Sequence, residues 1–258
     1  MSKFFTDPPE IITILHDSNN SYRVFFHSLR LAIALKGTLE IFDIRKDYEA
    51  IEHIGVRTLM ETWGFLQANS SHADVVAKGL KVAKRFGSGK KSEELQKRFS
   101  RKSYDMAIFG ENADAVFPWN RNRYLKIMLD KNLSILHIPP DCIDFVDETT
   151  GKFTVRSILF PIFYDEQYRL VEEAGKFFGE LFSEASPELC AFDINKDNNS
   201  TASISWNRQS SLSFEKSLLK SEMVIVATKF EQCSERMRKN VLNLIGTINK
   251  SVLFFLVN

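Results

Sequence analysis

The residues that could bind an anion follow an apolar stretch near the middle of the chain. Residues 106–109 are apolar and run into Gly110, after which the chain continues toward a predicted helix. Many α/β proteins hold a phosphate at such a junction, because a glycine-rich loop lets backbone N–H groups wrap the anion. This loop instead contains Glu111, Asp114 and the run Phe117-Pro118-Trp119. The two acids would repel a polyphosphate, so the sequence predicts a poor phosphate loop.

Three charged side chains near strand ends could supply other ligand contacts. Arg121 and Arg123 could clamp a phosphate through bidentate hydrogen bonds, or they could be two solvated arginines at a helix entrance. Asp17 follows the first buried strand, at the edge where open α/β sheets bind ligands. It could hold a ribose or bridge to a metal ion, or it could cap a turn in its Asp-Ser-Asn-Asn run. The Phe117-Pro118-Trp119 run has two interpretations. It could fill a pocket or contact a partner protein, or it could simply pack the loop against the sheet edge.

The sequence lacks the patterns of common catalytic and metal sites. It has no G-x-S-x-G turn, and its histidines show neither H-x-x-x-H nor H-E-x-x-H spacing. His16 and Asp17 are adjacent at the end of a predicted strand, where neighbouring side chains point to opposite faces, so they pair poorly. We therefore expect no catalytic residue and no metal site.

Composition indicates a globular protein without a strong electrostatic partner. The 258 residues carry a formal net charge of +1, with 44% hydrophobic and 26% charged residues. The run 81–103 is basic, but Glu93 and Glu94 interrupt it and no aromatic residues are interleaved as stacking platforms. A solvated helix face is therefore expected there, and no nucleic-acid partner.

Cysteine usage and hydrophobic runs indicate a cytoplasmic protein. Cys142, Cys190 and Cys233 are far apart and include no C-x-x-C pair, so they cannot form a disulfide framework. The N-terminal MSKFFTDPPE lacks the features of a signal peptide, and no apolar run approaches the roughly 20 residues of a membrane span. No membrane association is expected.

The second half of the sequence resembles the first. Three pairs of segments align, the last two at the same offset: 11–32 with 156–178, 104–112 with 221–229, and 132–140 with 249–257. The second half is shorter in its middle, where the polar loop 193–203 replaces the helix around Trp63. A shared offset across two separate strands favours an internal repeat over a chance likeness between apolar strands.

Each half reads as alternating strands and helices, which implies a parallel sheet covered on both faces. Ser21 and Ser92 are predicted helix N-caps, and Gly37 is predicted to end the first helix. The first half has predicted strands at 11–16, 38–44, 80–86, 106–109 and 133–138, and helices at 21–35, 56–66, 92–99 and 124–129. The second half has predicted strands at 158–163, 189–194, 202–206, 223–227 and 252–257. The link at 141–157 has a turn signal between two β-rich runs, which predicts a small hairpin.

These segments resemble the universal stress protein family. IITILHDSNNSYRVFFHSLRLAIALKGTLEIFDI is similar to the family's opening: an apolar strand, an Asp with Ser nearby, a helix and a second strand. FVDETTGKFTVRSILFPI resembles the linker and second opening of tandem bacterial members. The resemblance implies two five-stranded parallel α/β domains of strand order 3-2-1-4-5, related by a pseudo-two-fold axis. The implied domains are 1–140 and a shortened, degenerate 158–258, joined by a linker hairpin at 141–157.

The resemblance also implies a nucleotide pocket that this chain keeps only in part. Nucleotide-binding members carry G-x2-G-x9-G-[ST] after the fourth strand. Gly110 matches the first glycine, but Ala113 stands at the second, and a Cβ at such a position costs about 1 kcal/mol or more. The last pair falls on Arg123-Tyr124, or on Arg121-Asn122 if two residues are deleted.

Two further pocket positions follow from the resemblance. Asp17 is kept in the first half, whereas Phe163 stands at the matching place in the second, with Asp165 two residues on. The backbone near Ile44 would contact an adenine. The second half has no glycine in its matching loop, so any ATP or AMP is expected in the first domain.

Three functional hypotheses remain from the sequence. We expect a non-catalytic, stress-associated protein that acts through protein contacts, with weak or absent nucleotide binding and no cofactor. The first alternative is an ATP- or AMP-binding protein with a working pocket in the first domain. The second is a nucleotide-dependent enzyme of the same architecture, although HDSNNS only echoes the S-G-G-x-D-S motif and lacks its glycines.

The expected partner of each half is the other half. The segments 133–138 and 252–257 are apolar and would be edge strands, which proteins usually cover. Universal stress protein domains often pair through their last strands, so the resemblance implies that these two segments pair within one chain. A homodimer and an unidentified protein partner stay open.

Overall fold

A computed structural model describes most of the chain. The described residues are 4–15, 20–44, 55–86, 91–110, 125, 127–131, 133–163, 167–193, 218–229, 235, 238 and 250–257. The chain divides into two compact units. The N-terminal unit contains residues 5–140 and 146–152; the C-terminal unit contains Phe4, residues 141–145 and residues 153–258. The loop 146–152 thus goes with the N-terminal unit, although the sequence predicts it as part of a separate linker.

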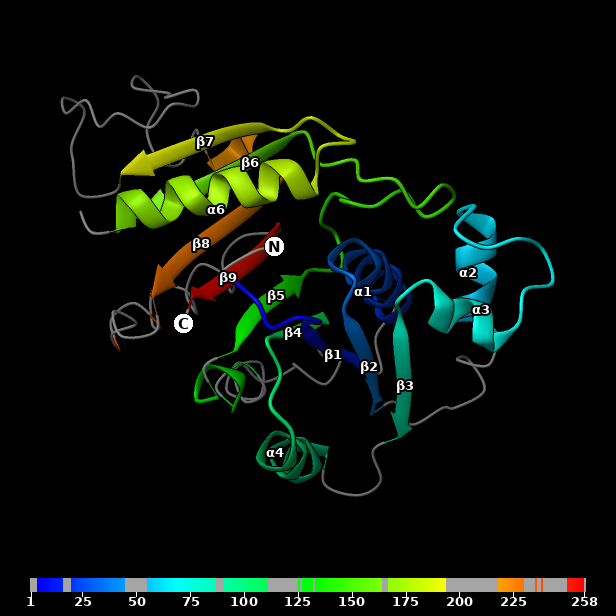
Figure 1. Ribbon diagram of the computed structural model, residues 1–258. Coiled ribbons are helices and arrows are strands. Elements are labelled where there is room, and N and C mark those ends of the chain that lie inside the picture. The colour runs from blue at the N-terminus through cyan, green and yellow to red at the C-terminus, as the bar shows by residue number, and fades with distance from the viewer. Residues whose placement is uncertain are drawn as a thin grey trace. The chain divides into compact units, whose positions relative to one another are not determined.

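The N-terminal unit contains a parallel sheet of five described strands (Figure 1). Its order is β3-β2-β1-β4-β5, and each neighbouring pair runs parallel. The strands are β1 (Glu10–Leu15), β2 (Thr38–Asp43), β3 (Lys81–Phe86), β4 (Met106–Gly110) and β5 (Ser134–Ile138). The order 3-2-1-4-5 is therefore correct for this unit. Every residue of β4 and β5 is buried, including the polar Ser134 and His137 of β5.

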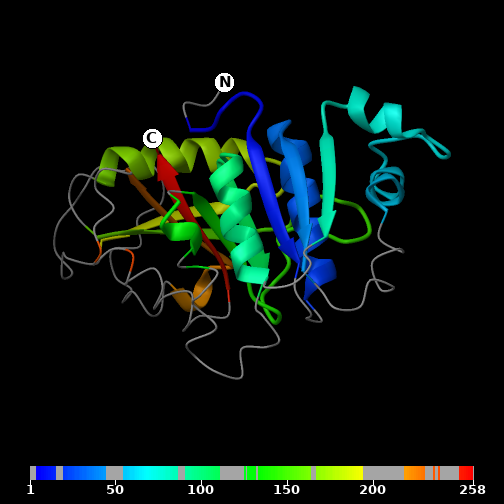
Figure 2. The same cartoon turned by 90° about the horizontal axis from the view of Figure 1, so that it is seen from below.

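Helices cover both faces of this sheet. Ile41 of β2 and Ile108 of β4 both align with Thr13 of β1, so these three side chains point to one face of the sheet. Gly110 is two residues after Ile108 and lies on the same face, whereas Glu40 is next to Ile41 and points to the opposite face. α1 (Ser21–Leu35) packs on the Gly110 face, where its Val24 lies beside the glycine. α4 (Lys91–Arg101) packs on the Glu40 face, because its Arg98 pairs with Glu40. Figure 2 shows the helices of this unit from below. The sheet is thus the middle layer of this unit.

Three helix ends, belonging to two predicted helices, differ from the structure. Ser21 is the first residue of α1 rather than its N-cap, and Ser92 lies inside α4, so both predicted caps are wrong. The left-handed position after α1 is held by Lys36, with φ 53°, instead of Gly37. Gly37 has a different role, because a Cβ there would lie 2.7 Å from the Pro9 carbonyl oxygen.

The predicted helix 56–66 is helical only over its first part, and a second helix that was not predicted lies beyond it. α2 (Val56–Thr62) ends at Trp63, and α3 (His72–Ala77) follows after a turn. The N-cap of α3 is Ser71, which forms a reciprocal capping box with Asp74. The last predicted helix of this half, 124–129, is described at Leu125 and residues 127–129, and these are helical.

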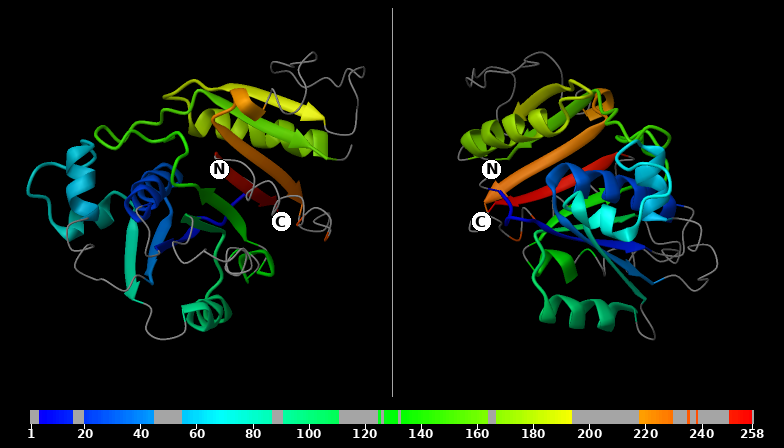
Figure 3. Two further views of the ribbon diagram at one scale, coloured as in Figure 1. Left: turned by 180° about the vertical axis from the view of Figure 1, so that it is seen from behind. Right: turned by 45° about the vertical axis from the view of Figure 1, so that its right-hand side comes forward.

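The C-terminal unit repeats part of this plan. Its strands are β6 (Ser157–Ile162), β7 (Glu188–Asp193), β8 (Met223–Lys229) and β9 (Ser251–Val257). Their order is β7-β6-β8-β9, with parallel pairs throughout, and α6 (Gln167–Leu181) lies along them (Figure 3). The predicted strand 202–206 lies outside the described residues. Among the helices that are described, none is long and apolar enough to cross a membrane.

Candidate functional site

The candidate site lies at the carboxyl ends of β1, β4 and β5. Asn20 precedes α1 at this edge and is only 3% exposed. Its amide Nδ2 donates a 2.6 Å hydrogen bond to the carbonyl oxygen of Ile138, the last residue of β5. Asn20 therefore ties the start of α1 to the end of β5, at the edge of the sheet where ligands bind in this architecture.

Gly110 ends β4 directly beneath this contact. A Cβ at Gly110 would lie 2.6 Å from Asn20 Nδ2, 2.7 Å from Val24 Cγ2 and 3.2 Å from the Ile138 carbonyl oxygen. Such distances are too short for any side chain, so the close approach of α1 requires glycine here. Gly110, which the resemblance assigns to a phosphate loop, thus has a packing role that needs no ligand.

Ile44 follows β2 at the same edge and is buried, with 1% of its surface exposed. Its backbone N–H donates a 2.9 Å hydrogen bond to the Leu15 carbonyl oxygen. That donor is therefore already used within the sheet, and an adenine could meet only other atoms of this backbone.

The oxygen of the Asn20 amide is the one feature here that points toward a ligand. Within the described part of the chain, the buried Asn20 Oδ1 has no hydrogen-bond partner. A buried polar atom without a partner costs free energy. A donor on a bound molecule, such as a hydroxyl or an amino group, would remove that cost.

The C-terminal unit has a closed arrangement at the corresponding place. Gln167 begins α6 and is fully buried. Its Oε1 accepts a 2.6 Å hydrogen bond from the Phe163 N–H, and its Nε2 donates a 2.7 Å bond to the Ala227 carbonyl oxygen. Both ends of this amide are satisfied by the protein, so Gln167 closes the edge between β6 and β8.

Four other predicted site residues lie outside the described residues: Asp17, Ala113, Arg121 and Arg123. Their roles therefore stay predictions. In the described ranges, no three His, Cys, Asp or Glu side chains are grouped so that they could hold a metal ion.

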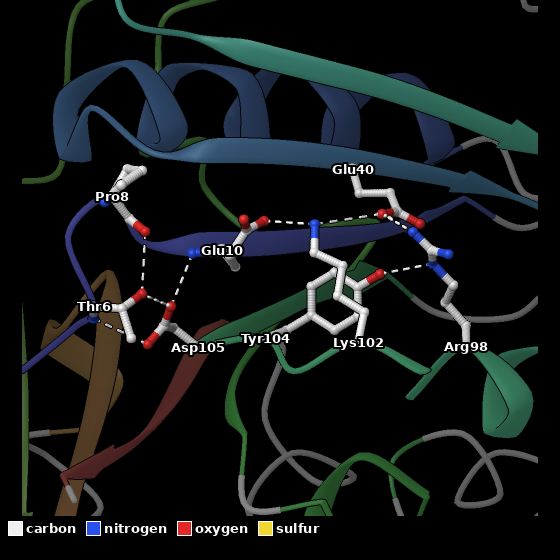
Figure 4. Close-up of polar contacts among 8 residues, drawn as sticks. All are labelled: Thr6, Pro8, Glu10, Glu40, Arg98, Lys102, Tyr104 and Asp105. Atoms are coloured by element: carbon white, nitrogen blue, oxygen red, sulfur yellow. Dashed lines mark hydrogen bonds and ion pairs between the residues drawn. The ribbon is translucent and has the colours of Figure 1, made fainter. Parts of the chain in front are cut away.

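A polar cluster that the sequence did not predict lies at the amino-terminal end of the N-terminal sheet (Figure 4). Glu40 is 1% exposed on β2, and its Oε2 lies 2.5 Å from Arg98 Nη2 and 3.7 Å from Lys102 Nζ. Lys102 also pairs with Glu10 at 2.6 Å. Arg98 Nε donates to the Tyr104 hydroxyl at 2.9 Å. The cluster thus joins β1, β2, α4 and the start of β4.

Electrostatics of this cluster favour a structural role. The Glu40 carboxylate raises the pKa of Arg98, which stays a cation. Burial and the same carboxylate raise the pKa of Tyr104, which stays protonated. Next to it, Asp105 accepts hydrogen bonds from the Glu10 N–H at 2.8 Å and the Thr6 hydroxyl at 2.6 Å. These groups are locked to one another and lie away from the carboxyl edge where this fold binds ligands.

The thiol of Cys190 is a poor nucleophile. Burial and the nearby Glu188 carboxylate raise the pKa of Cys190 to about 11, so it is a neutral thiol at pH 7. Cysteine chemistry is therefore not indicated at this position.

Comparisons with known proteins give a fold and no close relative. No family model matches this sequence, and no curated protein matches it. A functionally unknown protein from Pseudomonas aeruginosa PAO1 matches at TM-score 0.55 and 10% identity, over 96% of this chain and 93% of that one. A second solved structure, provisionally named a universal stress protein and from P. aeruginosa UCBPP-PA14, matches at TM-score 0.56 and 11% identity. The match covers 96% of this chain and 93% of that one.

A third solved structure extends the likeness to another organism. A universal stress protein from Archaeoglobus fulgidus DSM 4304 matches at TM-score 0.53 and 11% identity, over 96% of this chain and 98% of that one. At such identities the likeness concerns the fold alone, and fold does not fix function. This chain therefore has an α/β structure like that of universal stress proteins over nearly its whole length.

Proposed function

We propose that this chain is a non-catalytic, stress-associated protein of the tandem universal stress protein type that acts through protein contacts. Nucleotide binding is weak or absent and is confined to the N-terminal unit. The observation that carries this proposal is the packing at Gly110. The glycine that could approach a phosphate lies against Asn20, Val24 and Ile138, and the Ile44 N–H is bonded to Leu15.

The tandem arrangement is supported by the plan of the two units. β1 and β6 each have six residues, and α1 and α6 each have fifteen. The orders β2-β1-β4-β5 and β7-β6-β8-β9 correspond strand by strand. The sequence repeat and these orders support a duplicated domain whose second copy has lost its pocket, since Gln167 fills the place.

We also propose that β5 and β9 pair within the chain, as the last strands of two pseudo-two-fold related domains. Each is the terminal strand in the order of its own unit, and each consists mainly of apolar residues. An uncovered apolar edge strand invites association with other chains. Internal pairing removes that hazard and leaves other surfaces for a protein partner. The separated cysteines suit a reducing cytoplasm.

One observation favours a second candidate, an ATP- or AMP-binding protein whose pocket works in the N-terminal unit. It is the buried Oδ1 of Asn20, which has no hydrogen-bond partner in the described residues. A ligand hydroxyl or amino group would satisfy it. Because Gln167 has both amide ends satisfied, the same argument gives the C-terminal unit no pocket.

The two candidates differ in what the purified protein carries. The full-length protein would be purified without added nucleotide, denatured, and its supernatant analysed for ATP, ADP and AMP. Our proposal expects far less than one nucleotide per chain. A stoichiometric nucleotide would instead establish the second candidate, and Asp17→Ala should then abolish it while Asp165→Ala should not.

A further inference from the structure

The loop 146–152 is held on the N-terminal unit by side chains of α1 and by Trp63. Arg30 Nε donates a 2.5 Å hydrogen bond to the Gly151 carbonyl oxygen. Trp63 Nε1 donates a 2.8 Å hydrogen bond to the Glu148 carbonyl oxygen. The Tyr22 hydroxyl bonds to the Glu148 carboxylate, and burial together with this carboxylate raises the pKa of Tyr22 to about 12. Three side chains thus hold two residues of one loop.

The loop is preformed, so it can leave and return as one piece. Asp147 Oδ1 accepts hydrogen bonds from the N–H groups of Thr149 and Thr150, at 3.0 and 2.7 Å. Inside the same loop, the Gly151 N–H bonds to the Asp147 carbonyl and the Asp147 N–H bonds to the Lys152 carbonyl, each at 2.8 Å. These bonds do not involve α1 or Trp63, so undocking does not require the loop to unfold.

Docking depends on the glycine at the end of the loop. Gly151 has φ +65°, and a Cβ there would lie 2.4 Å from Trp63 Cγ. The loop backbone therefore lies against the indole, where no side chain fits. Any residue other than glycine would lift the loop from Trp63.

The docked state also buries a charge. Arg30 is 5% exposed, and its guanidinium lies 5.2 Å from the centre of the Phe65 ring. Burying a cation is costly, and the Gly151 carbonyl and the Phe65 ring offset part of that cost. The docked state therefore carries the cost of a buried charge, which lowers its net stability.

We propose that residues 146–152 form a latch on α1 that can bind to this helix and detach from it. The state of the latch controls the accessibility of the segment that joins the two units. The latch is closed when Arg30, Tyr22 and Trp63 hold the loop, and it opens when these three bonds break together. α1 also carries Arg23, whose guanidinium donates to the Pro140 carbonyl, so one helix holds the chain after β5 at several points. A change at the start of α1 would therefore reach the joining segment directly.

The test measures the indole N–H of Trp63, which is bonded only while the latch is closed. Full-length protein with ¹⁵N-labelled tryptophan would be transferred to deuterated buffer, and Trp63→Phe would assign the signal. Gly151→Ala should speed the exchange of this proton about ten-fold or more, because the added Cβ removes the 2.8 Å bond. Gly79→Ala is the matched control, because Gly79 has φ +82° but an added Cβ there meets nothing within 4 Å.

Trypsin supplies a second readout on the same proteins. The bond after Lys152 lies at the end of the docked loop, next to Phe153, which is 3% exposed, so undocking should make this bond easier to cleave. The proposal expects faster exchange in Gly151→Ala and in Arg30→Met, faster cleavage in at least one of them, and wild-type behaviour in Gly79→Ala. Exchange within two-fold of wild type in both latch variants would overturn it. So would equal acceleration in Gly79→Ala, since exchange would then follow loss of global stability.

Discussion

Removing Arg98 should expose how strongly the buried Glu40 carboxylate depends on its partner. Glu40 is 1% exposed and Arg98 is 26% exposed, so Arg98→Met would leave a carboxylate in the interior of the N-terminal unit. Breaking a buried ion pair on one side costs about 3–5 kcal/mol. Lys102 Nζ, 3.7 Å from Glu40, compensates in part, which places the expected loss at about 3 kcal/mol.

A double variant separates the cost of leaving one charge unpaired from the cost of losing packing at the same place. Glu40→Leu combined with Arg98→Met replaces the buried charges by apolar groups, which is often close to neutral. We expect this double variant to lie within about 1 kcal/mol of the wild type. Arg57→Met is the control, because its pair with Glu61 is an exposed i,i+4 contact worth about 0.5 kcal/mol at most.

Urea unfolding at pH 7 measures these differences. A Trp206→Phe background leaves the fluorescence of Trp63 and Trp119, which both belong to the N-terminal unit. A loss of about 3 kcal/mol lowers the midpoint by about 1.5 M if the slope is about 2 kcal/mol/M. The reasoning is refuted if Arg98→Met costs less than about 1 kcal/mol, or if the double variant is as unstable as the single one.

Three further predictions concern other parts of the molecule. Gly110→Ala should destabilise the N-terminal unit by about 1–3 kcal/mol in the same urea assay, through overpacking against Asn20 and Val24, and an unchanged midpoint would contradict this. Tyr22 and Tyr104 both have raised pKa values in the folded state, so their contribution to stability is complete below pH 10 and is lost as the pH rises from there toward 12. Thermal unfolding between pH 8 and 11 should show this loss, and Tyr22→Phe and Tyr104→Phe should each reduce it; unchanged profiles would contradict the assignment. Residues 1–150 expressed alone should self-associate through β5, and a strictly monomeric fragment at high concentration in sedimentation would count against the pairing with β9.

The order of elements in the first half could be predicted because strand signals there are local. β1, β2, β4 and β5 are apolar runs bounded by turns, and each predicted range overlaps its strand within one residue at either end. Helix ends were less predictable, because the cap depends on backbone geometry. Ser21 has the right chemistry for an N-cap, but the chain already turns into the helix at Asn20.

The contacts that define the sites could not be predicted, because they join residues far apart in sequence. Nothing near Glu40 in TLEIFD indicates that Arg98 approaches from a helix on the same face. A glutamate between Leu39 and Ile41 in a buried strand was nevertheless a usable signal of a buried pair. The Ser71–Asp74 capping box was also visible as S-x-x-D and would have indicated the start of α3, which was not predicted.

Gly110 shows why motif positions need a structure. In the sequence it stands where a phosphate loop would have its first glycine. In the fold the same residue allows Asn20 and Val24 to approach β4. Both explanations need glycine, so residue identity alone could not separate them.

Calorimetric titration of the full-length protein with MgATP tests the central claim most directly. The account predicts no binding, or binding far weaker than micromolar, because the Gly110 approach and the Ile44 N–H are already used by the protein. Any weak binding should disappear in Asp17→Ala and persist in Asp165→Ala. Micromolar or tighter binding of ATP would contradict the account, and so would binding that depends on Asp165.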